Sequence, residues 1–417
     1  MKISLRYGLR EVKIELSQEK LVGVFTPREI DGVEDAQTEV KRALKNPIGS
    51  KGLKDIVKLK DKIAIVIDDI TRPLPSQDIL PPLLDELTSS GIKEEDIIII
   101  IATGLHRKLT KKEICKLVGK EITDRIKAIN HDPYSKENLV CLGQTSRGSD
   151  IYISKTFIEA DVKILVGDIE YHQFFGYGGG AKSIHPGIAD AESIRHIHSL
   201  LDSPQARTGI LKGNPVQEEL KEVIQMAKPD FILNVVLDSK REIVKAFAGE
   251  IFEVFHQGAK LVDEMYKAKV PQRVDTVVAS CGGFPRDIDL YQSQKAIESA
   301  KKVVKQGGRI ILFARCQEGW GSEIFQKWMK ETENPEEIVG RIREKFIMGA
   351  HKAYLLAKEV QWAKVCLYSE MNPSEIEDAF LYPLTDLKEV DKLLEEAKEV
   401  IVLPYATTTL PGVENEV

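Results

Sequence analysis

The residues best suited to chemistry lie in one glycine-rich segment, YHQFFGYGGGAKSIHPG at 171–187. Successive backbone N–H groups at Gly178, Gly179 and Gly180 can form a nest for a phosphate. Lys182 follows them and can act as a point charge on that phosphate or, if desolvated, as a nucleophilic amine. The segment predicts a site for a nucleotide-like ligand, with a structural turn and an exposed lysine as the simpler alternative.

The same segment comes close to a P-loop, G-x4-G-K-[ST], which would indicate a nucleotide hydrolase. Ala181 stands where that motif requires glycine, and His185-Pro186-Gly187 follows where a helix should continue. We therefore keep a P-loop-like nucleotide-binding protein or hydrolase only as an alternative.

Histidines gather around this segment and suit proton transfer near neutral pH. His106 and His172 each stand just beyond a predicted strand. Two such groups on opposite sides of a substrate suit inversion at one carbon, although a lone histidine is more often structural. His196 and His198 lie two apart in a predicted helix and point about 200° apart, so at most one faces such a site. We favour His198, one turn after Arg195.

Two cationic side chains suit an anionic substrate. Arg72 lies in a stiff Thr-Arg-Pro turn, and its planar guanidinium matches a carboxylate. Lys295 belongs to a second strand, glycine loop and helix pattern, and it shares a helical face with Tyr291 and Gln292. We expect this second pattern to close over a ligand held by the first, with a solvated lysine as the alternative.

The hydrophobic pattern predicts the scaffold: an α/β fold in which mainly parallel sheets are flanked by helices. Short apolar runs alternate with longer amphipathic segments, and Thr110-Lys-Lys-Glu113 predicts a capping box. The expected strands are 63–67, 97–102, 162–166, 232–237, 276–279, 309–313 and 400–403. The expected helices are 76–90, 110–119, 190–201, 216–227, 251–267, 292–306, 321–331, 335–346 and 387–398.

Polar residues follow three of these strands, beginning at Asp68, Thr103 and Asp168. Ligands of such sheets bind outside the carboxyl ends of the strands. We therefore expect these three loops to meet at one edge of one sheet.

The length of 417 residues favours two domains. We expect a cofactor-binding and catalytic domain at 1–270, a domain at 271–398 that closes over the substrate, and an active site in the crevice between them. The strand and tail at 399–417 can pack back on the first domain.

Composition excludes several classes of protein. A net charge of −6 argues against a nucleic-acid surface, and the chain has no long apolar run for a membrane span and no signal-peptide core. Its five cysteines are scattered without a C-x-x-C pair, which favours a reducing, cytoplasmic setting.

Five motifs in this order resemble the nickel-pincer lactate racemase family across nearly the whole chain. None is distinctive alone, but together they form a specific pattern. They are DDITRP at 68–73, ATGLHR at 102–107, the segment 171–183, RHIH at 195–198, and the stretch from GGFP at 282 to YQSQK ending at 295.

The resemblance implies a cofactor, a nicotinic-acid-derived mononucleotide whose two sulfur-bearing arms hold Ni(II) in a sulfur–carbon–sulfur pincer. By similarity, Lys182 would join it covalently through a thioamide, and His198 would be the remaining ligand of a planar nickel site. Asp69, Thr71 and the glycines at 178–180 would contact the nucleotide. Enzymes that make this cofactor would be partners in maturation.

The resemblance also implies racemisation of a small 2-hydroxy acid, with lactate as the default. His106 and His172 would be the acid/base pair, while the C2 hydride moves to the cofactor and returns to either face of a 2-keto acid. The substrate would be held by Arg72, Lys295, Tyr291 and Gln292. The alternatives are the same mechanism on malate or on a longer or aromatic 2-hydroxy acid, and a protein that binds the cofactor without turnover.

Overall fold

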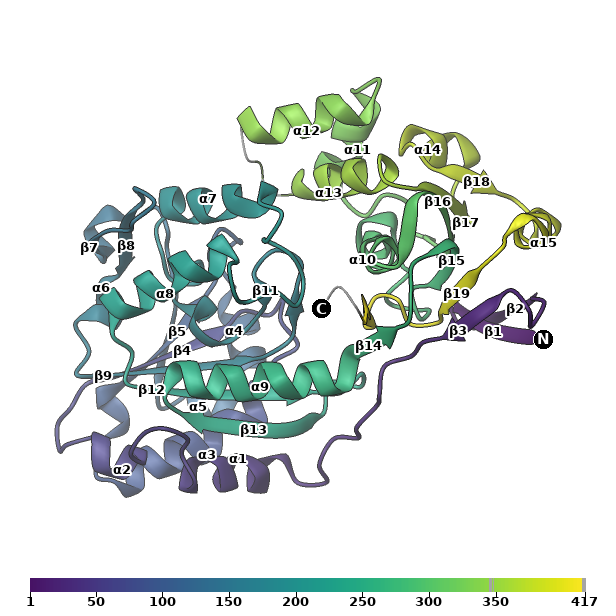
Figure 1. Cartoon of the computed structure of the whole chain (residues 1–417). Helices are drawn as coiled ribbons and strands as arrows, with labels where there is room; N and C mark the ends of the chain where they lie inside the picture. The colour runs from purple at the N-terminus through teal and green to yellow at the C-terminus, as the bar shows by residue number, and fades with distance from the viewer. Residues whose placement is uncertain (345–346, 348, 415–417) are drawn as a thin grey trace. The chain divides into compact units, whose positions relative to one another are not determined.

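The computed structural model describes residues 1–344, 347 and 349–414, and the chain divides into two compact units (Figure 1). We call Glu29–Met265 the central unit, and Met1–Arg28 together with the chain from Tyr266 onwards the terminal unit. The division lies close to the expected boundary at 270. Residues 1–28, however, were expected in the first domain and instead belong with the C-terminal half.

The central unit is built on a six-stranded sheet in the order β13-β12-β9-β4-β5-β6. All neighbours are parallel except β12 and β13, which are antiparallel. The strands β4, β5, β9 and β12 are nearly continuous apolar runs, because both of their faces are covered. The strands of this sheet span β4 Ile63–Asp68, β5 Ile97–Ala102, β6 Lys127–Asn130, β9 Val162–Asp168, β12 Phe231–Leu237 and β13 Ile243–Gly249.

Helices and short hairpins complete the central unit. The helices are α1 Ala36–Lys45, α2 Leu53–Ile56, α3 Ser76–Ser89, α4 Lys111–Val118, α5 Lys120–Thr123, α6 Lys155–Ile158, α7 Ala191–Ser199, α8 Pro215–Ala227 and α9 Ile251–Tyr266. The short 3-10 helices are η1 Glu94–Asp96, η2 Lys136–Asn138, η3 Gly180–Ser183 and η4 Leu200–Asp202. The hairpins pair β7 Leu139–Gln144 with β8 Asp150–Ser154, and β10 Tyr171–His172 with β11 Gly176–Tyr177.

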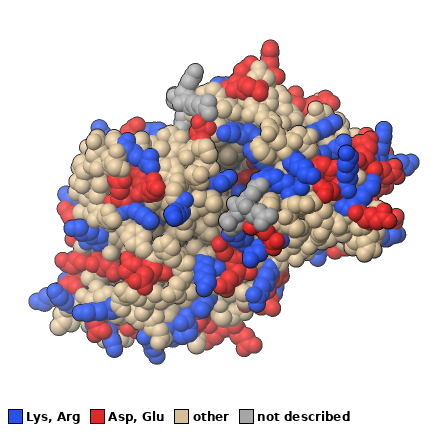
Figure 2. Space-filling view, in the orientation of Figure 1, with Lys and Arg blue, Asp and Glu red and all other residues tan. Residues whose placement is uncertain are grey.

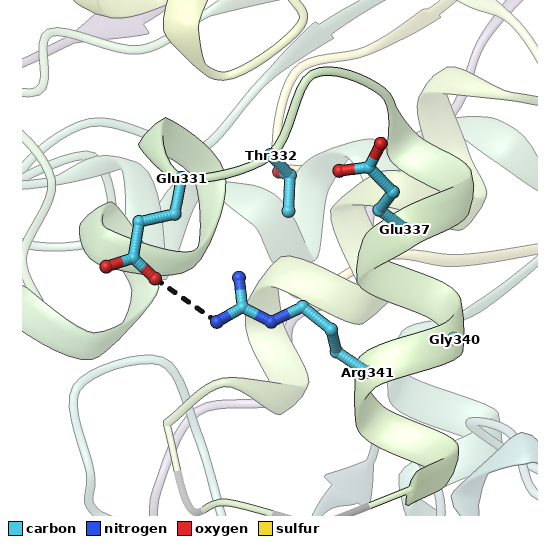
Figure 3. A pocket seen from close by; sticks show the side chains of 5 residues that line it. All are labelled: Glu331, Thr332, Glu337, Gly340 and Arg341. Atoms are coloured by element: carbon cyan, nitrogen blue, oxygen red, sulfur yellow. Dashed lines mark hydrogen bonds and ion pairs between the residues drawn. The ribbon is translucent and has the colours of Figure 1, made fainter.

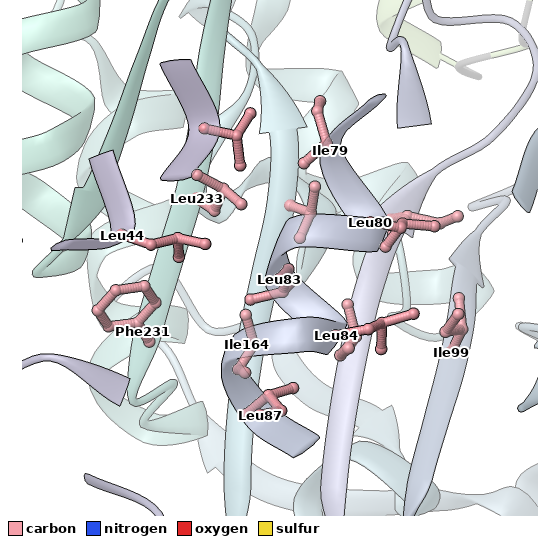
Figure 4. Packing of buried hydrophobic residues seen from close by; sticks show 14 of the residues in the cluster. Leu44, Ile79, Leu80, Leu83, Leu84, Leu87, Ile99, Ile164, Phe231 and Leu233 are labelled. Atoms are coloured by element: carbon pink, nitrogen blue, oxygen red, sulfur yellow. The ribbon is translucent and has the colours of Figure 1, made fainter. Parts of the chain in front are cut away.

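One face of this sheet carries an extensive hydrophobic core, which Figure 4 shows in part. Leu80, Leu83, Leu84 and Leu87 of α3 recur at helical spacing and are buried against the sheet. Burying such a side chain contributes roughly 1.5–3 kcal/mol. This packing fixes the strands whose ends carry the polar loops.

The terminal unit has an all-parallel sheet in the order β18-β17-β16-β15-β19-β3. Its strands are β3 Leu21–Val24, β15 Val274–Ser280, β16 Val304–Phe313, β17 Lys364–Tyr368, β18 Tyr382–Leu384 and β19 Val400–Leu403, with separate pairs β1 Lys2–Tyr7 and β2 Arg10–Glu15, and β14 Lys267–Val270 and β20 Leu410–Val413. Its helices are α10 Leu290–Lys301, α11 Glu323–Lys330, α12 Pro335–Glu344, α13 His351–Val360, α14 Pro373–Asp378 and α15 Leu387–Glu396.

Two expectations about this unit need correction. The strand and tail beyond 399 join the terminal unit, because β19 pairs with β15 and β3, and β20 pairs with β14. The helix expected at 292–306 ends at Lys301, because the chain from Val304 onwards already forms β16. The helix expected at 335–346 is observed as far as Glu344, and its last two residues lie outside the described residues.

The fold class is confirmed: both units are α/β, with parallel-rich sheets flanked by helices. The capping box is also present, with the Thr110 hydroxyl accepting from the Glu113 N–H and the Glu113 carboxylate accepting from the Thr110 N–H. Among the described residues, none of the helices combines the length and apolar character needed to cross a bilayer. Acidic and basic side chains are interspersed on the face shown in Figure 2.

Candidate functional site

The three polar loops of the central unit follow neighbouring strands, as expected. β9, β4 and β5 lie side by side and parallel, so the loops after Asp68, Ala102 and Asp168 leave the same edge of the sheet. A hydrogen bond between Asp69 and His106 joins two of these loops directly. The candidate site is therefore built on the carboxyl edge of this sheet.

His106 is held in place by its hydrogen bond to Asp69. Its Nδ1 lies 2.7 Å from Asp69 Oδ2, and its side chain is 45% exposed. An ionised carboxylate can only accept, so Nδ1 carries the hydrogen, and in the neutral ring Nε2 presents a lone pair. His106 is thus arranged to accept a proton at Nε2.

Asp69 is buried at the end of β4 and is also bound by Thr71. Its Oδ1 accepts from the Thr71 hydroxyl at 2.5 Å and from the Thr71 N–H at 3.0 Å. Burial alone would raise the pKa of Asp69, but the hydrogen bonds from His106 and Thr71 outweigh it and hold that pKa below its usual value. Both residues are expected to contact the cofactor; in this structure Asp69 is hydrogen-bonded to His106, and Thr71 to Asp69.

His172 is positioned by the short β10–β11 hairpin, in which it pairs with Gly176. Its Nδ1 accepts from the Phe175 N–H at 3.3 Å. In the neutral ring the hydrogen therefore sits on Nε2. His106 and His172 are held as opposite tautomers, one presenting a lone pair at Nε2 and the other an N–H.

Two neighbouring phenylalanines bring His172, His198 and Lys182 into one cluster. The His172 ring lies 4.7 Å from Phe174 and 5.0 Å from Phe175, edge to face. The His198 ring lies 5.3 and 5.9 Å from the same two rings, and Lys182 Nζ stands 5.0 Å from the centre of Phe175. Sequence analysis assigned no role to these phenylalanines, although they lie two and three residues after His172.

His198 is buried on α7 and offers one nitrogen. Its Nδ1 lies 2.6 Å from the carbonyl oxygen of Ile194, so Nδ1 donates and Nε2 keeps a lone pair. Burial lowers the pKa of His198 to about 4, which keeps the ring neutral, the form that binds a metal. As the helical spacing predicted, His196 points elsewhere, with Nε2 3.4 Å from Glu219 Oε1.

Lys182 lies in η3 among several charged groups. Burial, followed by the neighbouring Arg72, lowers the pKa of its amine well below the usual value, although Glu170 and Asp68 act in the opposite direction. Burial also raises the pKa of Asp68 to about 6. The amine at Lys182 is consequently suited to nucleophilic attack.

The three glycines before Lys182 let the loop approach the end of β9. A Cβ on Gly179 would lie 2.3 Å from the Asp168 carbonyl oxygen, and its φ is +77°. The Gly178 N–H donates to the Glu170 carbonyl at 2.7 Å, and the Gly180 N–H donates to Asn234 Oδ1 at 3.1 Å. These two N–H groups already donate within the protein, so a phosphate bound by all three glycine N–H groups would have to replace these hydrogen bonds.

Arg72 contacts an acidic residue that sequence analysis did not select. Its Nη1 lies 3.3 Å from Glu170 Oε1, and the Arg72 side chain is 34% exposed.

Asn234, in the apolar strand β12, is another residue that sequence analysis did not select. It is fully buried, and its Nδ2 has no hydrogen-bond partner among the described residues. An amide inside the run FILNVVL was the signal that could have identified it.

The other three candidates lie on α10 of the terminal unit. Asp289 caps this helix by accepting from the Gln292 N–H at 2.7 Å. Tyr291 and Lys295 are one turn apart, with Lys295 exposed.

A pocket of about 620 Å³ in the same unit is lined by none of the candidate residues. Figure 3 shows the residues that line it, Glu331, Thr332, Glu337, Gly340 and Arg341.

The protein's own side chains do not form a complete metal site. No cluster of three or more His, Cys, Asp or Glu within the described part of the chain could hold a metal ion. One buried neutral imidazole, His198, beside the lysine Lys182 fits a metal whose other ligands come from a cofactor. The residues present are therefore compatible with the expected group.

Comparison with known proteins gives consistent matches along the chain. Family models described as lactate racemase N-terminal domain and lactate racemase C-terminal domain match residues 7–209 and 270–411. A lactate racemase of Thermoanaerobacterium thermosaccharolyticum is 35% identical over 402 residues, covering 94% of both chains. One from Lactiplantibacillus plantarum is 33% identical over 407 residues, covering 95% of this chain and 94% of its own.

Solved structures agree with these matches. The lactate racemase apoprotein of Thermoanaerobacterium thermosaccharolyticum has a TM-score of 0.89 at 33% identity, covering 99% of this chain and all of its own. A Thermotoga maritima protein has a TM-score of 0.64 at 17% identity, covering 93% of this chain and 100% of its own, and shows likeness of fold alone.

Proposed function

We propose that this chain interconverts the D and L enantiomers of a small 2-hydroxy acid, with lactate as the default substrate. The chain belongs to the lactate racemase family and is a racemase. The observation that carries this proposal is the pair of histidines that are each hydrogen-bonded at Nδ1, which directs Nε2 of both rings to proton transfer. Inversion at C2 needs one group that takes the hydroxyl proton and one that returns it. His106, after β5, and His172, on β10, would supply these two functions.

In the proposed cycle His106 Nε2 accepts the proton of the substrate hydroxyl, and Asp69 stabilises the imidazolium that forms. For the transfers to balance, His172 enters this direction as an imidazolium, donates its Nε2 proton to the substrate oxygen on return to the alcohol and is left neutral. In the opposite direction neutral His172 is the base and protonated His106 is the acid. One proton thus passes from one ring to the other in each turnover, and the total number of protons does not change.

The nickel-pincer nucleotide would supply the acceptor for the hydrogen on C2 when it is bound. Lys182 would hold it through a thioamide and His198 would ligate nickel through Nε2. The lowered pKa of Lys182 and the hydrogen bond that directs His198 Nε2 away from Ile194 support these assignments. Contacts of Asp69, Thr71 and the glycines 178–180 with the nucleotide remain predictions.

Arg72 is proposed to bind the substrate carboxylate. Its guanidinium contacts Glu170 through one nitrogen, and the side chain is partly exposed, so its other nitrogens can reach a ligand. Lys295, Tyr291 and Gln292 of α10 are proposed to contribute to the same function. We also propose cofactor-making enzymes as maturation partners and a cytoplasmic location.

A P-loop-like hydrolase is less consistent with the site. Lys182 and Ser183 sit in the short helix η3 and not at the start of a long helix, which a P-loop requires to cradle phosphates. Absence of ATP turnover by purified protein would exclude this alternative.

The proposal is tested on protein made in cells that also express the cofactor-making enzymes. Intact mass should show a nucleotide-sized adduct on Lys182, and metal analysis about one nickel per chain. Polarimetry with single enantiomers of lactate, malate and larger 2-hydroxy acids identifies the substrate.

Single substitutions then assign the roles. His106→Ala and His172→Ala should each abolish racemisation while nickel stays bound, and Lys182→Ala should lose the adduct. Full activity in Lys182→Ala, or an unmodified nickel-free wild type from such cells, would contradict the mechanism.

A further inference from the structure

A buried lysine lies beneath α10, the helix that carries the proposed substrate-binding residues Tyr291 and Lys295. Lys352 is in the first turn of α13 and is only 3% exposed. Burying an ammonium group is costly unless it has a specific environment. The buried ammonium group of Lys352 therefore needs specific partners in the folded protein.

Lys352 begins a hydrogen-bonded chain between two helices. Its Nζ donates to Gln294 Oε1 at 2.8 Å, and Gln294 Nε2 donates to Glu359 Oε1 at 2.6 Å. Gln294 and Glu359 are also buried. The amide of Gln294 can adopt only one orientation here, because the ammonium must donate and a carboxylate must accept. Gln294 thus joins α10 firmly to the charged side chains of α13.

The ammonium group of Lys352 also lies against the side of α10 that carries Tyr291. Lys352 Nζ stands 5.3 Å from the centre of the Tyr291 ring. Burial, and then the charge of Lys295, lower the pKa of Lys352 to about 7, while Glu298, Glu359 and Asp289 oppose the shift. The interaction with Lys295 means that the two lysines repel each other and that both contribute positive potential around Tyr291.

We propose that Lys352 is a positioning residue for anion binding, which holds Tyr291 and adds its charge to that of Lys295 on the outer face of α10. The proposal rests on the function proposed above, in which α10 binds the substrate carboxylate. An anion at Lys295 relieves the repulsion between the two lysines, so binding and the charge of Lys352 favour each other. Lys352 itself does not need to touch the substrate.

The test separates substrate affinity from turnover in nickel-loaded, full-length enzyme. Lys352→Met removes the charge with similar side-chain length, and KM for the 2-hydroxy acid should rise about tenfold, as expected for one unit charge acting over several ångströms in a protein. The kcat should change by less than about twofold, because the carboxylate keeps its charge throughout the reaction, so the bound substrate and the transition state lose the same interaction. Lys358→Met is the matched control, since Lys358 lies on the same helix, with Nζ 5.6 Å from the Tyr354 ring centre.

A pH series adds a readout that a merely structural role would not change. Wild-type KM should rise as pH increases through about 7, because Lys352 loses its charge, whereas Lys352→Met should lack this step. The other charged groups around the amine are present in both proteins, so their contributions to KM cancel when the wild type is compared with the variant. These groups are Lys295, Glu298, Asp289 and Glu359.

Lys352→Gln provides a second variant if Lys352→Met does not fold, because it keeps a hydrogen-bonding group but not the charge. The same rise in KM is expected. Unchanged KM and an unchanged pH profile in an active enzyme would overturn this inference alone. A loaded wild type that inverts no 2-hydroxy acid would overturn the proposed function, and this inference with it.

Discussion

Asp69 ties the candidate base His106 to the end of β4. Its carboxylate takes hydrogen bonds from His106 and from both donors of Thr71, and its pKa lies below the usual value although the group is buried. A buried, ionised carboxylate at 2.7 Å fixes the tautomer and the orientation of the His106 ring. We therefore regard Asp69 as a positioning residue that acts through His106.

The substitution Asp69→Asn should weaken proton transfer while leaving the cofactor in place. We expect kcat to fall about 100-fold, the lower end of the range for general acid–base catalysis. The asparagine amide can also turn its NH2 toward the ring, which removes the preference for a hydrogen on His106 Nδ1. Stopped-time polarimetry measures the loss of rate.

Asp55→Asn on the exposed side of α2 is the matched control and should behave as wild type. Nickel content and the Lys182 adduct should be unchanged in both variants. Loss of nickel and of the Lys182 adduct in Asp69→Asn would instead place Asp69 at the cofactor.

At the scale of elements, the loop before η3 depends on its close approach to β9. Gly179 has a φ of +77°, and a Cβ there would meet the Asp168 carbonyl at 2.3 Å. The same loop is fixed by the bond from the Gly180 N–H to Asn234 on β12. The strand ends thus determine where Lys182 lies.

Gly179→Ala should displace this loop and slow attachment of the cofactor. Backbone strain at positive φ costs about 1–3 kcal/mol, and the clash adds to it. We expect a lower Tm and loss of most of the Lys182 adduct, measured by calorimetry and intact mass.

Gly213→Ala is the matched control for this change. Gly213 has a nearly equal φ of +75°, but a Cβ there has nothing within 4 Å. Gly213→Ala should therefore show the same backbone strain as Gly179→Ala but keep the cofactor adduct on Lys182. Equal adduct yields in the two variants would show that the approach to β9 is not important for cofactor attachment.

At the scale of the whole molecule, the terminal unit is made of both ends of the chain. Ile3, Leu5 and Tyr7 of β1 are buried in a core that also contains Val278, and β3 pairs with β19. The C-terminal half lacks these side chains when residues 1–28 are removed. At roughly 2 kcal/mol for each fully buried side chain, the loss is comparable to the whole stability of a domain.

We therefore expect residues 266–417 alone to unfold without cooperativity, whereas the same segment followed by a Gly/Ser linker and residues 1–28 should show a cooperative transition. Thermal unfolding monitored by circular dichroism distinguishes the two. Residues 29–265 serve as the comparison and should unfold cooperatively by themselves. An equally stable 266–417 fragment would contradict the assignment of residues 1–28 to this core.

Long buried strands and amphipathic helices were predictable because their patterns are local. The strands β4, β5, β9 and β12 are continuous apolar runs, and the capping box at Thr110 is a short-range signal. Short or edge elements such as β3, β6 and β18 carry little pattern of their own and were missed. Their existence depends on pairing with strands distant in sequence.

Local patterns in the sequence were enough to predict the fold class, the edge of the sheet where polar loops gather, and the residue types that suit racemisation. Contacts in the folded chain were needed to show that Asp69 is hydrogen-bonded to His106, that two glycine N–H groups bond to Glu170 and Asn234, and that residues 1–28 complete the C-terminal half. The reason is physical: periodicity and turn chemistry act over a few residues, whereas hydrogen-bond partners and strand order depend on contacts between segments far apart in the chain.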